Sequence, residues 1–599
     1  RRGCEMKPPL FCVSLACCAG FSAVVQEAAP RPTALRWPRP TALRCARPAL
    51  CDDEQARRLN SLIAKVATST EEILQVCEHY EDQLSAANYA TALTWLAKRR
   101  RPDGFTDSTC EGAVKVANRA AALTLETRWR PRSLANAAWG SAKLLSFAGG
   151  APPPELRRAL RSCLEKVARN ALGELEYFNG QELANLAWAM AAGDCRDAEV
   201  FERIAEKAPS ASFRPQELSN IIWSFGKLVQ MDDGGGSEGA RRAALRPLTR
   251  EAGKRFSEFK PQELANIVWA VATCGFDAGT DFWDLAATEM ISNFEADVRT
   301  AKSADFDFAR DVAGRSVRAT GNRRGRGKGQ QQHSRYVTQT QNLGNFLWAA
   351  AKTKACSPET TRRLFEVAGA LAFKRMAELN NQELGNVAWA FATVGVHCEG
   401  LFERIASVAT PKLASFNTQN VANVLWAFAT ARPRGGGDDF PFFRAAAREA
   451  AKKAKDFKPQ ELANCLWAFA AAGVRAPPKE FLDAFAIEAS AKVHLFTEQG
   501  LSNVAWSYSN FDAPPYLDLF ENIEKEVVRR GARELTPQAM ANLPWSFANA
   551  ELRADDLFDA IGRDIATGGA AIAGNRQRPS SSSSSSLDDD VKDKDDEKD

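Results

Sequence analysis

One phrase recurs ten times along this 599-residue chain, and it constrains the fold more than any other feature. Its clearest copies read Pro-Gln-Glu-Leu-Ala-Asn-x-x-Trp-Ala and begin at Pro261 and Pro459. The asparagine of the phrase, which we call the anchor, recurs mostly every 35 to 49 residues, and the last spacings are 41, 39 and 39. This is the period of a helix-pair solenoid. The anchors are Asn136, Asn185, Asn220, Asn266, Asn345, Asn386, Asn423, Asn464, Asn503 and Asn542.

A tryptophan follows each anchor by three residues, so the phrase has a fixed register. These ten residues are Trp139, Trp188, Trp223, Trp269, Trp348, Trp389, Trp426, Trp467, Trp506 and Trp545. At 100° per residue, the phrase forms a helix with a broad apolar arc and a narrow polar side. In the clearest copy the arc holds Leu264, Ile267, Val268 and Val271, whereas Gln262, Glu263 and Asn266 lie opposite. Such a helix is buried on two sides, and a proline before the glutamine suits its first turn.

Each phrase is followed by a second, more variable helical pattern, which completes a pair. The sequence therefore predicts an all-α fold, a right-handed-type α-solenoid of tandem helix-pair repeats of about 38 to 41 residues. The predicted segments are a targeting leader (1–51), degenerate N-terminal capping repeats (52–128), helical repeats (129–294), a basic flexible insertion (295–335), helical repeats (336–575) and a disordered Ser-rich, acidic tail (576–599).

The first 51 residues have the composition of a targeting peptide. An uncharged stretch over 10–25 follows Met6 and Lys7, as in a signal peptide, and residues 26–50 are rich in Arg, Pro, Ala and Thr with Glu27 as their one acid. This order resembles the bipartite plastid-targeting leaders of algae, with Phe21 at the cleavage point. We therefore expect an organellar protein, in a plastid before a mitochondrion; a mispredicted first exon is the alternative.

The position six residues before each anchor is the candidate binding row. Its residue is always polar, never acidic, and differs between copies, and these types hydrogen-bond to base edges or phosphates. Its place at a helix N-terminus also favours anions. The alternative is that a helix start prefers small polar residues, which accounts for Asn and Thr but not for Arg and Lys. The row consists of Arg130, Asn179, Arg214, Lys260, Gln339, Asn380, Asn417, Lys458, Thr497 and Thr536.

The invariant residues have a structural interpretation, because a residue that never changes cannot read a sequence. A glutamine lies four residues before the anchor in nine copies, the exception being Arg132. We expect the Gln and Asn amides to join neighbouring repeats by hydrogen bonds, and the tryptophans to pack in the core. Direct ligand contact is the alternative for both.

The phrase and its period, over residues 59–564, resemble the octotricopeptide repeats of algae. They are also similar to the leucine-rich repeats of FAST-kinase-like proteins and to the helical repeats of the mitochondrial RNA-editing substrate-binding complex. The resemblance implies a factor that binds organellar transcripts and acts on their stability, processing, splicing or translation. Members often end in a nuclease-like RAP domain, whereas this chain passes from Ile561 into Gly, Ala and Ser.

The sequence therefore favours a sequence-selective single-stranded RNA-binding protein, with other organellar RNA-processing proteins as further partners. A solenoid scaffold for proteins, without RNA binding, is the alternative. No phosphate loop, nucleophile elbow or paired cysteine spacing is present in the repeats, so we expect no enzyme activity, no cofactor and no metal. We also expect no membrane span. The formal net charge of +4 permits nucleic acid as a partner without requiring it.

Overall fold

The computed structural model consists of α-helices joined by turns and short 3-10 helices, and its described residues contain no strand. The predicted all-α fold is confirmed. The leader, most of the expected insertion and the expected tail lie outside the described residues. The described residues are 53–575 except 67, 100–104, 147–151, 232–237, 301–337, 432–440, 532 and 534.

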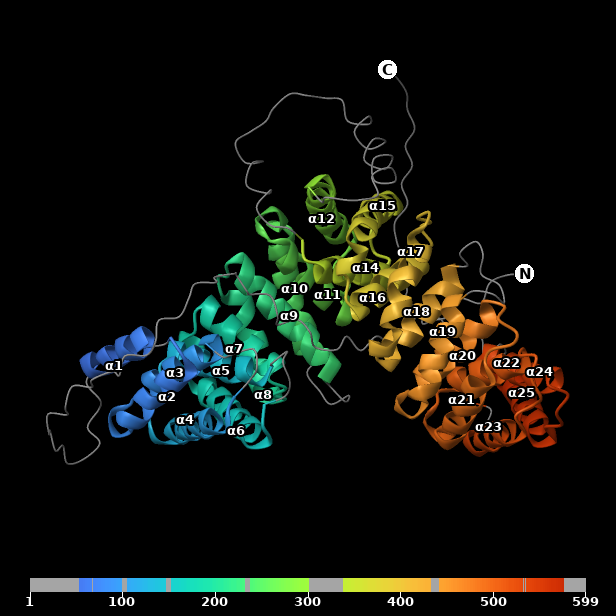
Figure 1. Ribbon diagram of the computed structural model, residues 1–599, viewed down its shortest axis with the longest axis horizontal. Helices are drawn as coiled ribbons and strands as arrows, with labels where there is room; N and C mark the ends of the chain where they lie inside the picture. Colours follow the sequence, from blue (N-terminus) through green and yellow to red (C-terminus); the bar gives the residue numbers. More distant parts are fainter. Residues whose placement is uncertain are drawn as a thin grey trace, which may run out of the picture. The chain divides into compact units, whose positions relative to one another are not determined.

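The chain divides into two units, residues 1–415 and 416–599. In each unit the helices that carry the phrase, here called motif helices, pack against one another in chain order (Figure 1). In the first unit they are α5 (Pro131–Leu145), α7 (Gly180–Ala192), α9 (Pro215–Met231), α11 (Pro261–Thr273), α14 (Thr340–Thr353) and α16 (Asn381–Val394). In the second they are α18 (Thr418–Ala431), α20 (Pro459–Ala471), α22 (Glu498–Ser509) and α24 (Pro537–Asn549).

The helices between them, here called partner helices, form a second layer that also packs in chain order. This two-layer stack is the predicted solenoid of helix pairs. The first unit has α6 (Pro154–Ala171), α8 (Ala198–Lys207), α10 (Glu238–Gly253), α12 (Thr280–Thr300), α15 (Pro358–Arg375) and α17 (Leu401–Ala409). The second unit has α19 (Pro441–Lys452), α21 (Lys479–Ala491), α23 (Leu517–Arg530) and α25 (Asp555–Asn575).

Two further helix pairs precede the first phrase, in the region expected to cap the solenoid. They are α1 (Asp53–Val66) with α2 (Thr70–His79), and α3 (Ala86–Arg99) with α4 (Asp107–Glu126). Helix α3 packs on α5 as motif helices pack on one another, so we count α3, with Ser85 before it, among the motif helices and α4 in the partner layer. Asn88 fixes its start: its Oδ1 accepts from the Ser85 N–H at 2.9 Å, and its Nδ2 donates to the Ala56 carbonyl at 2.8 Å.

The expected insertion differs from the structure at its start. Helix α12 continues to Thr300, past the boundary predicted at residue 295, because its last turns bury Asp297 and Val298. Asp297 Oδ2 accepts from the backbone N–H of Thr338 at 2.8 Å, which holds this helix end beside the start of α14. Since α14 also packs directly on α11, the insertion does not divide the stack, and the chain divides into its two units after Ser415 instead.

The start of each motif helix follows from its sequence. In nine copies a buried apolar residue precedes the first turn, as Phe259 precedes α11. In five copies a glutamate at the third helical position accepts from the backbone N–H of the residue before the helix, as Glu263 does from Lys260. The apolar arc predicted for α11 is fully buried: Leu264, Ile267, Val268 and Val271 all have 0% exposure. The helix is thus packed on two sides, as its pattern predicts.

Glu526 in α23 gives the second unit a measurable dependence on pH. Its carboxylate is 6% exposed and accepts from Arg529 at 2.7 Å and from Arg530 at 2.6 Å. These hydrogen bonds, that of Arg529 first, lower the pKa of Glu526 from 4.5 to about 2. A lowered folded-state pKa adds stability that is complete above the unfolded value and is lost as the pH falls through the folded one.

We therefore expect the pair to stabilise the second unit fully above pH 4.5, and progressively less as the pH falls towards about 2. Thermal unfolding measured by circular dichroism between pH 6 and pH 3, on the natural chain and on Glu526→Gln, tests this. The variant should lose less stability than the natural chain over this range. Equal losses in the two proteins would show that Glu526 does not titrate as its contacts imply.

Candidate functional site

All ten residues of the candidate binding row are exposed, and all ten immediately precede a motif helix. We call them the N-cap row. Consecutive motif helices of a unit begin side by side: Ser219, in the first turns of α9, donates from Oγ to the carbonyl of Glu263, in the first turn of α11, at 2.9 Å. Six members therefore follow one edge of the first unit, from Arg130 to Asn380. Four follow an edge of the second, from Asn417 to Thr536.

Half of the N-cap row caps helices in the ordinary way. The side-chain oxygen of each of these residues accepts a hydrogen bond from the backbone N–H three residues further on. Asn179, for example, accepts from Glu182 at 2.9 Å while the Glu182 carboxylate accepts from the Asn179 N–H at 3.0 Å. Helix capping therefore accounts for the residue type at Asn179, Asn380, Asn417, Thr497 and Thr536.

Capping does not account for the cations in the row. Lysine and arginine side chains carry no acceptor for a helix N–H, and a positive charge at a helix N-terminus opposes the helix dipole. In these copies the glutamate accepts from the N–H of the N-cap residue itself, at 2.8 Å for Arg214 and 3.0 Å for both Lys260 and Lys458, as it also does in the Asn179 copy. The side chain of Arg214 is 82% exposed. A ligand that carries negative charge would offset the cost of placing cations here.

The invariant residues lie on one side of each motif helix, where the glutamine is the most accessible and the asparagine and tryptophan are largely covered. Counted from the N-cap residue, positions 2, 6, 9 and 13 lie on one helical stripe, because they are spaced by four, three and four. In α11 the stripe contains Gln262, which is exposed, then Asn266, Trp269 and Thr273. We call this surface the amide stripe, after the Gln and Asn side chains that recur in it.

The tryptophans of the stripe pack against one another between consecutive repeats. Ring centroids lie 6.4 Å apart for Trp139 and Trp188, 6.3 Å for Trp223 and Trp269, and 6.5 Å for Trp348 and Trp389. Trp348 and Trp389 are each 1% exposed. Trp545, on the last motif helix described, is 47% exposed. Each indole is therefore covered chiefly by the neighbouring motif helix.

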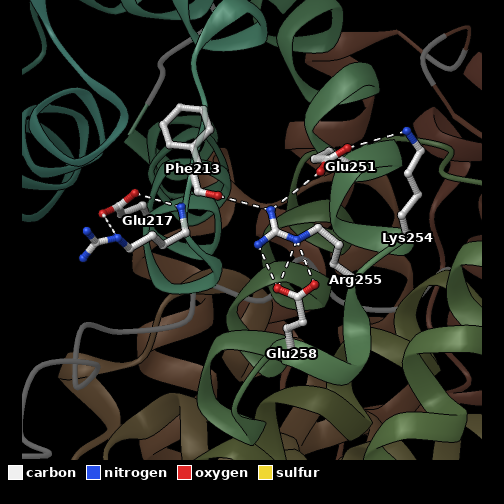
Figure 2. Close-up of polar contacts among 7 residues, drawn as sticks. Phe213, Glu217, Glu251, Lys254, Arg255 and Glu258 are labelled. Atoms are coloured by element: carbon white, nitrogen blue, oxygen red, sulfur yellow. Dashed lines mark hydrogen bonds and ion pairs between the residues drawn. The ribbon is translucent and has the colours of Figure 1, made fainter.

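Basic residues that sequence reasoning missed join consecutive repeats. Each lies five or six residues before one N-cap residue, and donates to the carbonyl that precedes the N-cap residue of the repeat before it. In Figure 2 the Arg255 guanidinium lies between the Phe213 carbonyl, at 3.2 Å, and the Glu258 carboxylate, at 2.8 Å. The equivalent donor and acceptor pairs are Arg375 and Thr338, Lys412 and Leu379, Lys453 and Phe416, Lys492 and Phe457, and Arg530 and Phe496.

We call these hydrogen bonds between consecutive repeats the ties. Removing one of them should destabilise the stack. We expect Arg255→Met to lower the free energy of unfolding by about 1–2 kcal/mol, because the Phe213 carbonyl loses a charged donor while the methionine keeps the packing of the side-chain stem. Lys254→Met is the matched control: Lys254 is exposed and pairs with Glu251 at 3.6 Å, as Figure 2 shows, so its loss should cost less than about 0.5 kcal/mol. Urea unfolding of both variants tests this, and equal midpoints would contradict the role of the tie.

Burial keeps several of the described thiols from being activated. Burial raises the pKa of Cys77 and Cys356 to about 12, and that of Cys163 and Cys398 to about 11. They are therefore protonated at neutral pH and poor nucleophiles. Within the described ranges, no cluster of His, Cys, Asp and Glu is placed to hold a metal ion. None of the described helices combines the length and the apolar character needed to cross a membrane.

The two-layer stack of helix pairs defines the class of protein as an α-solenoid of tandem repeats. No protein-family model matches the chain, and no characterised protein matches its sequence. Among solved structures, the chain is similar to one described as a "homology model of the full-length AP-3 complex in an intermediate open conformation", with 9% identity over 86% of this chain and 93% of that one, and a TM-score of 0.17.

A second similar structure is described as a "circular tandem repeat protein with novel repeat topology and enhanced subunit contact surfaces". The identity is 13% over 86% of this chain and 99% of that one, and the TM-score is 0.16. With scores this low, neither likeness bears on what this chain binds.

Proposed function

We propose that this protein binds single-stranded RNA in a sequence-selective manner, and that it acts on organellar transcripts. One observation carries the proposal: a row of exposed residues differs from repeat to repeat and contains cations that helix capping does not account for, on motif helices whose glutamine, asparagine and tryptophan hardly change. Repeat proteins that read one base per repeat divide their residues in this way, into a constant frame and variable contacts. The composition of the leader supports an organellar location.

The role is one of binding rather than catalysis. Cys77 and Cys163 are buried thiols of raised pKa, and the variable residues lie in a row along an edge instead of converging on one point, as catalytic groups must. Transcript stability, processing, splicing or translation would then be controlled by the occupancy of the RNA, together with partner proteins that process it.

The N-cap row provides the test. We expect the full chain to bind a labelled 20-nucleotide RNA of mixed sequence in fluorescence anisotropy, and Arg214→Ala/Lys260→Ala/Lys458→Ala to weaken binding by roughly tenfold to a hundredfold. Selection from a random RNA pool should also recover a preferred sequence.

The control is Arg158→Ala/Lys166→Ala/Lys254→Ala, which removes the same charge from exposed residues of the partner layer. It should bind as the natural chain does. If the natural chain shows no binding to RNA at low salt, the proposal is wrong. The alternative, a scaffold for proteins, is favoured by the solenoid architecture itself, and it predicts a polypeptide ligand whose affinity does not change when RNA is added.

A further inference from the structure

A second cationic row lies on the motif-helix layer of the first unit. Lysine occurs thirteen residues after the N-cap residue in α3, α5, α9 and α14, where the other motif helices of this unit have Ala192, Thr273 and Thr393. An acid never occupies the position. We call Lys98, Lys143, Lys227 and Lys352 the lysine row; it lies at the far end of the amide stripe from the N-cap row.

Three of these lysines lie close to aromatic rings. Lys98 Nζ lies 4.9 Å from the ring centroid of Trp95, Lys143 Nζ lies 5.9 Å from that of Trp188 on the next motif helix, and Lys352 Nζ lies 4.9 Å from that of Trp348. Lys352 extends back one turn over Trp348, because side chains on a helix lean towards its N-terminus. Lys98 lies over a ring three residues earlier, and Lys143 over a ring of the next motif helix. These three ammonium groups therefore lie close to tryptophans.

The lysine row is partly desolvated. Lys227 is 8% exposed, Lys143 and Lys352 are half-buried, and burial lowers the pKa of Lys352. The contacts of Lys98 and Lys352 described above are with indole rings, which orient an ammonium but do not neutralise its charge. A buried cation is costly until an anion approaches it. An anion bound at the half-buried Lys352 would therefore gain more binding free energy than one bound at the exposed Lys98 or at exposed lysines of the partner layer.

The two rows enclose a strip of constant width. Nine residues separate the N-cap level from the tryptophan level, which is about 13 Å at a rise of 1.5 Å per residue. Between them lie the glutamines of the amide stripe, such as Gln262, which is exposed, whereas the anchor asparagines are more enclosed, as Asn345 is at 6% and Asn386 at 4% exposure. Because these amides recur in nearly every repeat, they suit contacts that are independent of sequence. One single strand of nucleic acid fits a strip of this width.

We propose that the lysine row binds the phosphates of single-stranded RNA, whose bases then point across the amide stripe towards the N-cap row of the first unit. The inference rests on the proposed function and gives the RNA an orientation. Phosphate contacts fix the position of the RNA but do not depend on its sequence, whereas the variable N-cap residues would make the contacts that distinguish bases. Loss of the lysine row must therefore weaken the binding of all sequences equally.

The test uses the full chain and the variant Lys98→Gln/Lys143→Gln/Lys352→Gln, with a labelled RNA of the selected sequence and one of scrambled sequence. We expect both affinities to fall roughly tenfold or more, with their ratio unchanged, and the salt slope to fall by about 2. The same substitutions to arginine keep the charge and should keep the affinity. Lys227 is left in place because it is buried.

The matched control is Lys115→Gln/Lys166→Gln/Lys254→Gln, in which three exposed lysines of the partner layer of the same unit are neutralised. If it weakens RNA as much as the lysine-row variant, the effect is one of net charge and the inference is wrong. If the lysine-row variant binds as the natural chain does, the inference is wrong while the proposed function stands. If the natural chain does not bind RNA at all, both are wrong.

Discussion

Replacing Trp389 with alanine is expected to cost about 3–5 kcal/mol of unfolding free energy, the range for truncating a fully buried aromatic side chain. Trp389 is 1% exposed, and its ring centroid lies 6.5 Å from that of Trp348 in the preceding motif helix. The truncation would leave a cavity between two helices of the first unit. Each repeat of a solenoid contacts only its neighbours, so the loss of stability should be concentrated around α14 and α16.

Urea unfolding followed by circular dichroism measures the loss, and hydrogen exchange at the amides of α16 locates it. Trp545→Ala is the matched control, because Trp545 has the same place in the phrase but is 47% exposed on the last motif helix described. It should cost less than about 1 kcal/mol. A Trp389→Ala protein that keeps its stability but loses RNA affinity would show that the tryptophan contacts the ligand instead of forming the core.

The second large effect is expected at Gly140, where two motif helices approach too closely for a side chain. A Cβ atom there would lie 2.7 Å from the backbone carbon of Leu93 and 2.8 Å from its carbonyl oxygen, in α3. These are backbone atoms of a packed helix, so α3 would have to move. We expect Gly140→Ala to lower the free energy of unfolding by about 2–3 kcal/mol, despite the better helix propensity of alanine.

Gly344→Ala is the control for this substitution. Gly344 also lies within a motif helix, but its Cβ would meet the nearest atoms of α16 at 3.6 Å, an ordinary contact. Other copies of the phrase carry alanine at the same place, for example Ala265. The variant should be neutral or more stable by up to about 1 kcal/mol. Comparable losses at both glycines, in thermal and urea unfolding, would mean that close approach is not what Gly140 provides.

The sequence predicts the motif helices well because each carries its own start signal and its own apolar arc. The register from Gln262 to Trp269 determines which side of α11 is buried, and the structure buries that side. The end of α12 could not be placed in the same way. Its last turn is held by Thr338, 41 residues further along the chain, and the local sequence pattern does not predict that contact.

The candidate site was predicted in part. The position of the N-cap row follows from helix spacing. Which of its residues cap their helix, as Asn179 does, and which do not, as Lys260 does not, is seen only from the hydrogen bonds in the structure. The ties were missed although their signal is present, since a basic residue recurs five places before Lys260, Asn380, Asn417, Lys458 and Thr497. The division of the chain after Ser415 has no counterpart in the phrase, because packing between whole repeats decides it.

The direction of the ties bears on how the protein is made. Each donor is synthesised after its acceptor, as Arg255 is 42 residues after Phe213 and Lys453 is 37 after Phe416. At about 5–20 residues per second, a nascent repeat waits roughly 2–8 s for the residue that closes it. During that interval its apolar arc has no following helix to cover it. Ribosome-bound chains should therefore gain protease resistance in steps of one repeat, and always one repeat behind synthesis.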